Sequence, residues 1–317
     1  MSGTGPIRIA IVGVGNVGAS LAYALVLGGL AAEIVLIDNN RARAEGEAMD
    51  LSHAVPFAEP THVWAGDYDD CAGAAVTVIC AGANQKPGET RLDLLRRNAD
   101  ILRAIVPQVV RYNPEGILLV ATNPVDVLTF GALKLSGLPA SAVFGSGTTL
   151  DTARFKYLLG EHYGVDPRSV HAYIIGEHGD SEVPVWSLAN IAGMQLMKYC
   201  EAQAIGCTPE DMDSIFRKTR DAAYEVIQRK GATYYGVAAG LLRIIEAIGR
   251  DQRTVLTVST LVEDLHGLSG VCLSLPCVIG QDGVERVIRL DLSQKESEAL
   301  RQSAAVLEAA IAQVSFT

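Results

Sequence analysis

One histidine stands where a proton-transfer group is expected. His178 lies between two glycines in the segment GEHGD (176–180), directly after the apolar run VHAYII. A polar side chain at the end of an apolar strand faces a cleft, and its ordinary pKa near neutrality lets an imidazole donate or accept a proton. A nearby aspartate would favour the protonated form. The pattern predicts an acid/base residue, with an ordinary loop histidine as the alternative.

A cation that can hold a carboxylate is predicted in the segment DTAR (151–154). Asp151 and Arg154 are three residues apart in a helical pattern, so they share one face of the helix. A guanidinium can bind a carboxylate through two hydrogen bonds and thereby orient the substrate. The alternatives are a solvated surface charge for Arg154 and a helix-start role for Asp151.

The polar, glycine-flanked segment 82–91 follows another apolar run. Ligands of open α/β sheets bind at the carboxyl ends of the strands, so this segment is predicted to be a mobile loop over the site. Arg91, at its far end, can then close over a carbonyl group and exclude water.

Residues 13–18 read GVGNVG, follow an apolar run and precede a helical pattern. Gly13 permits the tight turn, Gly15 lets the backbone approach a pyrophosphate, and Gly18 allows close packing of helix and strand. Asp38 ends the next apolar run, 20 residues after Gly18, where it can accept hydrogen bonds from ribose hydroxyls. Its carboxylate would repel a 2′-phosphate, so NAD is expected rather than NADP. An empty turn with an exposed aspartate is the alternative.

The elements that must position these residues differ between the two halves of the chain. The first half alternates helical patterns with the apolar runs IRIAIVGVG, EIVLID, AAVTVICAGA, GILLVATNPV and AVFGS. Near-continuous apolar runs are typical of strands buried on both faces. We therefore predict a Rossmann-type, doubly wound parallel sheet with right-handed crossovers.

The second half predicts an α+β substrate domain. A long helix is expected after Thr208, with Pro209 at its first position. VLTVSTLVE, VCLSLPCVIG and VERVIRLDL are predicted as antiparallel strands, the last two joined by a QDG turn. Ser293 and Glu296 form a capping-box pattern before a closing helix. The expected domains are residues 1–145 for NAD, including the loop 82–91, and residues 146–317 for catalysis and substrate.

Composition excludes several classes of partner. The 317 residues are 49% hydrophobic and carry a formal charge of −10, which argues against nucleic acids and anionic membranes. The N-terminal residues show no export signal. Six cysteines form no C-x-x-C pair, so we expect reduced thiols, no metal site and a cytoplasmic location.

At this point a family resemblance is clear. GVGNVG with Asp38, AGANQKPGETR, TNPVD, GSGTTLDTARF, IIGEHGDSEVPVWS and KGATYYGVA occur in the order found in bacterial L-lactate dehydrogenases of the lactate/malate dehydrogenase superfamily. The chain resembles this family over essentially its whole length. The resemblance implies reversible reduction of pyruvate to L-lactate by NADH, with His178 as proton donor and acceptor and Asp151 as its partner. It also implies that Arg154 binds the substrate carboxylate and that Arg91 polarises the carbonyl.

Further contacts follow from the same resemblance. It places Asn123 beside the carbonyl and His178, Ser146 near the nicotinamide amide, and Thr233 in the substrate pocket. The expected cofactor contacts are Gly13, Gly15, Asn16, Val17, Gly18, Asp38, Gly82, Ala83, Asn123 and Ser146. The family also implies a cytoplasmic homotetramer that serves glycolysis and pyruvate fermentation.

Residue 85 bears on the identity of the substrate. Malate dehydrogenases of the superfamily carry an arginine where this chain has Gln85, six positions before Arg91. An arginine there would pair with a second carboxylate, whereas a neutral glutamine leaves that charge uncompensated. A monocarboxylate such as pyruvate is therefore expected. A malate dehydrogenase resembling lactate dehydrogenases is the alternative, and Gln85 as a plain loop residue would leave the choice open.

Two residues leave regulation open. Many bacterial relatives are tetramers that fructose 1,6-bisphosphate activates through an arginine and a histidine of adjoining subunits. His171 matches that histidine, but Lys156 occupies the arginine position, and lysine keeps the charge without the bidentate fork. Activation by the bisphosphate and plain interface or surface roles for both residues are the two alternatives.

Two more distant functions fit the sequence less well. An NAD-dependent glycosidase would share a Rossmann core but needs a metal site, and no ligand cluster is visible in the sequence. A non-catalytic NAD-binding protein would not require the charged set His178, Asp151, Arg154 and Arg91.

Overall fold

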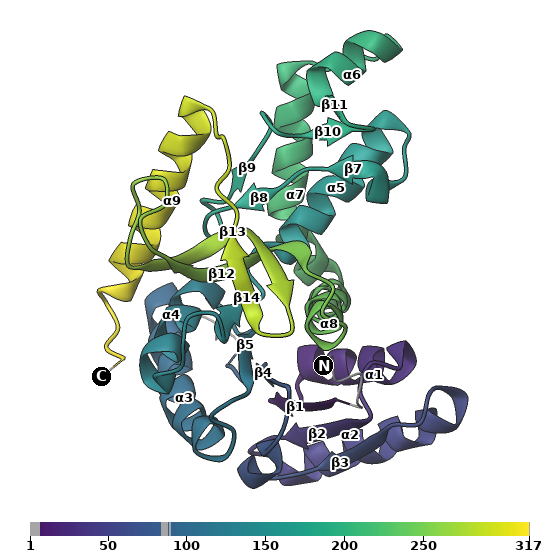
Figure 1. Cartoon of the computed structure of the whole chain (residues 1–317), viewed down its shortest axis with the longest axis vertical. Helices are drawn as coiled ribbons and strands as arrows, with labels where there is room; N and C mark the ends of the chain where they lie inside the picture. Colours follow the sequence, from purple (N-terminus) through teal and green to yellow (C-terminus); the bar gives the residue numbers. More distant parts are fainter. Residues whose placement is uncertain (1–6, 84–87, 89, 317) are drawn as a thin grey trace.

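The largest sheet of the computed structural model runs through both halves of the molecule (Figure 1). The structure describes residues 7–83, 88 and 90–316. Within these residues the sheet has nine strands, in the order β14-β13-β12-β6-β5-β4-β1-β2-β3. Loops at the carboxyl ends of its parallel strands are where open α/β sheets bind ligands.

Six parallel strands form the first part of this sheet. Strand β3 is absent from the predicted series, because it is short and begins with an exposed histidine rather than an apolar run. Strands β4 and β5 are buried at every position, as expected of strands covered on both faces. The strands are β1 (Arg8–Val12), β2 (Glu33–Ile37), β3 (His62–Ala65), β4 (Val76–Ile79), β5 (Ile117–Val120) and β6 (Val143–Gly145).

The second half adds an antiparallel part to the same sheet. Strand β12 (Thr254–Val262) pairs antiparallel with β6 through Ser259 and Gly145, and with β13 (Val271–Gly280) along its full length. Strand β14 (Gly283–Val287) follows after a turn at Gln281 and Asp282. The predicted hairpin is confirmed, although β14 is shorter than the run VERVIRLDL.

The small strands of the second half lie outside this sheet. The predicted strand VHAYII is divided in two, because its first two residues pair with Asn190 and Ile191 and its last two with Val183 and Pro184, in separate small sheets. The short strands are β7 (Val170–His171), β8 (Ile174–Ile175), β9 (Val183–Pro184), β10 (Asn190–Ile191) and β11 (Met194–Gln195).

Some of the described helices cover the large sheet, others pack against the small strands or one another, and several carry site residues. The predicted capping residues are confirmed: the side chain of Thr208 accepts the Asp211 N–H, and that of Ser293 accepts the Glu296 N–H. The helices are α1 (Asn16–Gly28), α2 (Arg41–Ala54), α3 (Arg91–Tyr112), α4 (Val125–Ser136), α5 (Thr149–Tyr163), α6 (Leu196–Gln203), α7 (Pro209–Lys230), α8 (Tyr235–Gly249) and α9 (Gln294–Ile311), with 3-10 turns at Val55–Phe57, Tyr68–Cys71 and Pro167–Ser169.

Two apolar layers hold the helices on the sheet. Leu21 of α1 and Leu241 of α8 belong to one layer, and Leu102 of α3, Leu128 of α4 and Leu300 of α9 to the other. In Figure 1, α9 and α4 lie on one side of the sheet and α8 on the other. This double covering is the Rossmann-type arrangement that the sequence predicts.

The chain ends on the α4 side of the sheet. Phe316 is buried, and its ring lies edge-on to Phe130 with 6.4 Å between the ring centroids. The carbonyl oxygen of Ser315 accepts hydrogen bonds from Arg103 of α3 at 2.9 and 3.1 Å. A Cβ on Gly131 would lie 2.3 Å from the Phe316 ring, so this docking requires a glycine in α4. None of the helices within the described residues is long and apolar enough to cross a membrane.

Candidate active site

The turn between β1 and α1 is shaped by two glycines. Gly13 has φ +97°, and a Cβ there would lie 2.3 Å from the backbone nitrogen of Ala81, so only glycine fits. Gly15 precedes the first residue of α1 and has no side chain with which to cap it. The first N–H groups of α1 are therefore open to an anion, as a pyrophosphate site requires.

Asp38 lies at the end of β2 and faces this turn. Its Oδ2 accepts the N–H of Val14 at 2.8 Å, and its Oδ1 accepts the N–H of Asn40 at 2.9 Å. Each carboxylate oxygen keeps a further lone pair, which can accept a ribose hydroxyl. This arrangement fits a dinucleotide, because the glycine turn and the uncapped start of α1 can hold its phosphates and the anchored carboxylate can hold a ribose. The predicted residues Asn16, Val17 and Gly18 form that start of α1.

Two further loops meet at Asn98, a buried residue of α3 that the sequence did not single out. Its Oδ1 accepts the N–H of Ala83 at 2.8 Å, and its Nδ2 donates to the carbonyl oxygen of Asn123 at 2.8 Å. Gly82 lies against Thr122, two residues after β5, since a Cβ there would lie 2.4 Å from the Thr122 side chain. Asn98 thus fixes the predicted cofactor residues Ala83 and Asn123 relative to one another.

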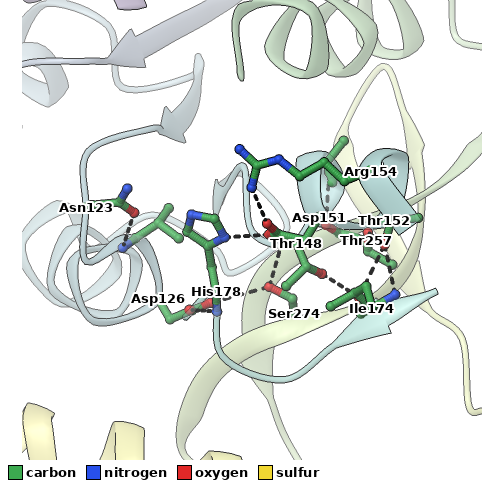
Figure 2. A network of polar contacts seen from close by, with 12 residues as sticks. Asn123, Asp126, Thr148, Asp151, Thr152, Arg154, Ile174, His178, Thr257 and Ser274 are labelled. Carbon is green, nitrogen blue, oxygen red and sulfur yellow. Dashed lines mark hydrogen bonds and ion pairs between the residues drawn. The ribbon is translucent and has the colours of Figure 1, made fainter. Parts of the chain in front are cut away.

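His178, Asp151 and Arg154 come together as predicted. Asp151 and Arg154 lie one turn apart on α5, and Arg154 Nη1 donates to Asp151 Oδ1 at 2.9 Å. The ring nitrogen Nδ1 of His178 lies 2.5 Å from Asp151 Oδ2. Figure 2 shows the imidazole and the guanidinium reaching the same carboxylate from different sides. Since Nδ1 is engaged, Nε2 is the ring nitrogen left for a substrate.

Burial and charge act against each other at this pair. Burial disfavours a charged imidazole, but the Asp151 carboxylate outweighs it and raises the pKa of His178 to about 9. Burial would likewise raise the pKa of Asp151, yet the charges of His178 and Arg154 lower it. The pair is therefore an imidazolium beside a carboxylate at neutral pH, which is the form that donates a proton.

Two buried acids beside His178 were missed by the sequence. Asp126, in the first turn of α4, accepts the backbone N–H of His178 through Oδ2 at 2.7 Å. Glu182 is 6% exposed, and its Oε1 has no hydrogen-bond partner among the described residues. Burial and the nearby Asp151 raise the pKa of Glu182 to about 8. Both lie in motifs of the family resemblance, Asp126 in TNPVD and Glu182 in IIGEHGDSEVPVWS, but the motifs alone gave neither residue a role.

Arg91 lies at the start of α3 and reaches the His178 loop. Its Nη1 donates to Asp180 Oδ2 at 2.9 Å, and its Nη2 lies 3.2 Å from the hydroxyl of Tyr224 on α7. The side chain is 75% exposed. Asp180 thus binds Arg91, and Asp151 rather than Asp180 contacts the His178 ring.

The other predicted substrate and cofactor residues are placed as follows. Ser146 is buried directly after β6, where its N–H donates to the carbonyl oxygen of Val120 at 2.8 Å. Thr233 is half-buried between α7 and α8. Gln85 lies outside the described residues, as do the other residues 84–87 and 89 of the predicted mobile loop.

The two residues considered for regulation lie on neighbouring elements. Lys156 is half-buried on α5, and burial lowers its pKa. His171 is exposed on β7, which contacts α5. Over the residues that the structure covers, no hydrogen bond or ion pair joins the two, and no group of three or more His, Cys, Asp or Glu side chains can hold a metal ion.

Two models of known protein families match this sequence. The sequence model described as lactate/malate dehydrogenase, NAD binding domain, matches residues 7–145, and the one described as lactate/malate dehydrogenase, alpha/beta C-terminal domain, matches residues 148–316. The chain belongs to the lactate/malate dehydrogenase family. It is an NAD-dependent 2-hydroxy acid dehydrogenase, as predicted.

Individual members of the lactate/malate dehydrogenase family agree over almost the full length. The L-lactate dehydrogenase of Acetivibrio thermocellus is 51% identical over 302 residues, 95% of each chain. That of Moorella thermoacetica is 51% identical over 98% of this chain and 99% of its own. The minor L-lactate dehydrogenase of Enterococcus mundtii superposes with a TM-score of 0.96 at 43% identity, covering 98% of this chain and 99% of its own. The predicted resemblance, fold class and NAD cofactor are confirmed.

Proposed function

We propose that this enzyme interconverts pyruvate and L-lactate with NAD, using His178 as the acid and base. The observation that carries the proposal is the buried Asp151 carboxylate shared by His178 and Arg154. This carboxylate brings the His178 imidazole and the Arg154 guanidinium side by side, and a 2-keto acid presents the two groups that they would bind.

Arg154 would bind the substrate carboxylate. One of its guanidinium nitrogens is held by Asp151 at 2.9 Å, and its side chain is only 16% exposed. The remaining N–H groups can grip a carboxylate in a bidentate manner. Because the anchor on Asp151 fixes the guanidinium, the carbonyl of the bound acid is oriented toward His178.

His178 would transfer the proton. In pyruvate reduction its Nε2–H donates to the carbonyl oxygen and leaves a neutral imidazole, while Asp151 holds Nδ1–H. NAD in its reduced form supplies the hydride that the carbonyl carbon accepts. In lactate oxidation the neutral Nε2 takes the hydroxyl proton, and the Asp151 carboxylate stabilises the imidazolium that forms.

Other residues would complete the site. Asn123 and Arg91 would donate hydrogen bonds to the carbonyl oxygen, for which Arg91 must leave its present partner Asp180. The turn at Gly13, Gly15 and Asp38 would hold the dinucleotide, and Ser146 and Thr233 would line the nicotinamide and substrate ends.

The deciding experiment compares pyruvate with oxaloacetate. NADH oxidation should show a higher kcat/KM for pyruvate, because the neutral Gln85 of the sequence offers no charge to a second carboxylate. Gln85→Arg should move the ratio toward oxaloacetate. A preference for oxaloacetate in the unmodified enzyme would make it a malate dehydrogenase and refute the proposal.

We also infer the organisation of the enzyme. The matches to residues 7–145 and 148–316 support an NAD-binding domain at 1–145 and a substrate domain at 146–317. Exposed apolar side chains of α1, α2 and α5, among them Leu27, Met49 and Tyr157, support association into the homotetramer that the family resemblance implies. The unpaired state of the six cysteines agrees with a cytoplasmic location.

Activation by fructose 1,6-bisphosphate is the remaining proposal. Lys156 and His171 lie on contacting elements and are the candidates to bind its phosphates. Pyruvate saturation curves with and without the bisphosphate test this, and identical curves would remove the proposal.

A further inference from the structure

The main chain that carries His178 is held at three successive residues. The N–H of Gly176 donates to the carbonyl oxygen of Ser274 on β13 at 2.9 Å, and the N–H of Glu177 donates to Ser303 Oγ on α9 at 2.8 Å. The N–H of His178 itself donates to Asp126 Oδ2 on α4 at 2.7 Å. Of these three acceptors, only Asp126 carries a charge.

Burying the Asp126 carboxylate costs free energy, because a charged group is stabilised by water. Its side chain is 2% exposed, and burial raises its pKa to about 6. A neutral acceptor, such as the hydroxyl that serves Glu177, would satisfy the N–H of His178 without burying a carboxylate. The N–H of His178 therefore does not by itself account for a negative charge on Asp126.

The position of Asp126 suggests what the charge does. It lies three residues after Asn123, in the first turn of α4, and its Oδ1 lies 3.5 Å from the hydroxyl of Ser274. Ser274 in turn accepts the N–H of Thr148, just before α5 with its Asp151 (Figure 2). One carboxylate thus joins the α4 start, β13 and the histidine loop.

We propose that Asp126 is a positioning residue for His178, whose buried carboxylate fixes the main chain that presents the imidazole and adds a second negative charge to that of Asp151. This rests on the proposed acid/base role of His178. Asp126 touches neither substrate nor cofactor in this scheme, and it acts through the histidine.

Several titratable or charged groups must be counted with Asp126. Asp151 of α5 and Glu182 of the histidine loop act on His178 directly. Arg154 and Arg220 lie near Glu182, and Glu177 lies near Asp126. Negative charge on Asp126 stabilises the imidazolium, so its removal should lower the pKa of His178. The charge of Asp151 remains in every variant below.

The test is a nuclear magnetic resonance titration of the histidine rings in the full chain without substrate. There are six histidines, and a His178→Gln variant identifies the resonance of interest. Asp126→Asn keeps an oxygen that can accept the N–H but removes the charge, and it should lower the pKa of His178 by about one pH unit. The matched control is Glu296→Gln, a buried carboxylate held by Ser187 and Ser293, which should leave the titration unchanged.

Kinetics give a second readout. In pyruvate reduction Asp126→Asn should lower kcat about tenfold at alkaline pH and change KM little, since Arg154 is untouched. Asp126→Ala should add a loss of kcat at every pH, and if it does not fold, Asp126→Asn decides. An unchanged His178 titration in Asp126→Asn, or an equal shift in Glu296→Gln, overturns the proposal. The titration needs no turnover, so failure of the enzyme to reduce pyruvate would refute the proposed function and leave this result standing.

Discussion

Replacing Asp151 with asparagine tests the central pair most directly. The amide preserves the shape of a side chain that is 4% exposed and lies 2.5 Å from His178 Nδ1. The pKa of His178 is about 9 against an ordinary 6.5, and at about 1.36 kcal/mol per pH unit this corresponds to roughly 3 kcal/mol in favour of the imidazolium. Without Asp151, burial is opposed only by Asp126 and Glu182, so the pKa should fall to its ordinary value or below.

Two losses add up in this variant. At pH 7 an imidazole with a pKa of 6.5 or below is mostly neutral, which by itself lowers kcat/KM for pyruvate about fourfold or more. The amide also no longer holds Nδ1–H in the tautomer and orientation that the reaction needs, so kcat/KM, followed by NADH absorbance, should fall by roughly 10²-fold overall. Asp166→Asn is the matched control, because Asp166 is paired with Arg168 at 2.6 Å on the surface and its loss should not affect kcat/KM. If a folded Asp151→Asn kept kcat/KM within about threefold of the unmodified enzyme, the reasoning would be wrong.

Three further predictions concern the substrate clamp, the proton and the docked C-terminus. Arg154→Lys keeps the charge but loses the planar fork, so KM for pyruvate should rise about tenfold or more in steady-state assays; an unchanged KM contradicts the clamp. Since imidazolium is the donor and the pKa of His178 is raised to about 9, kcat/KM for pyruvate should be level at neutral pH and fall about tenfold per pH unit above pH 9. A fall that begins near pH 6.5 contradicts this. Gly131→Ala places a Cβ 2.3 Å from the Phe316 ring and should lower the free energy of unfolding by about 1–3 kcal/mol in urea titrations. Gly131→Ala should destabilise a protein that already carries Phe316→Ala by less, because the ring that the Cβ would meet is gone. Equal losses of stability with and without Phe316→Ala contradict a clash between these two side chains.

The sequence predicts the fold wherever one local pattern decides the structure. The glycines at 13, 15 and 18 and the capping residues Thr208 and Ser293 act within a few residues of the backbone that they shape, so their spacing is sufficient. Pairing between distant strands is different. The bond between Ser259 of β12 and Gly145 of β6 joins residues more than a hundred positions apart, and nothing in either run specifies the other.

The residues of the site likewise fall into those that local sequence predicts and those that only the fold reveals. Asp151 and Arg154 are predictable because a helix places residues three apart on one face. Asp126 is not, because an acid in the first turn of a helix is ordinary chemistry for a helix start, and only the fold brings the His178 loop to it. Asn98 is hidden for the same reason, since its two partners come from the ends of different strands.

The pairing of β6 with β12 joins both halves in one sheet, and this has a mechanical consequence. A hinge between residues 1–145 and 146–317 would have to break backbone hydrogen bonds at Gly145 and Ser259, beside Gly147, where a Cβ would already lie 2.5 Å from the Ser259 nitrogen. Rigid-body rotation of one half against the other is therefore opposed by the sheet itself. We therefore expect substrate to enter without a rotation of one half against the other.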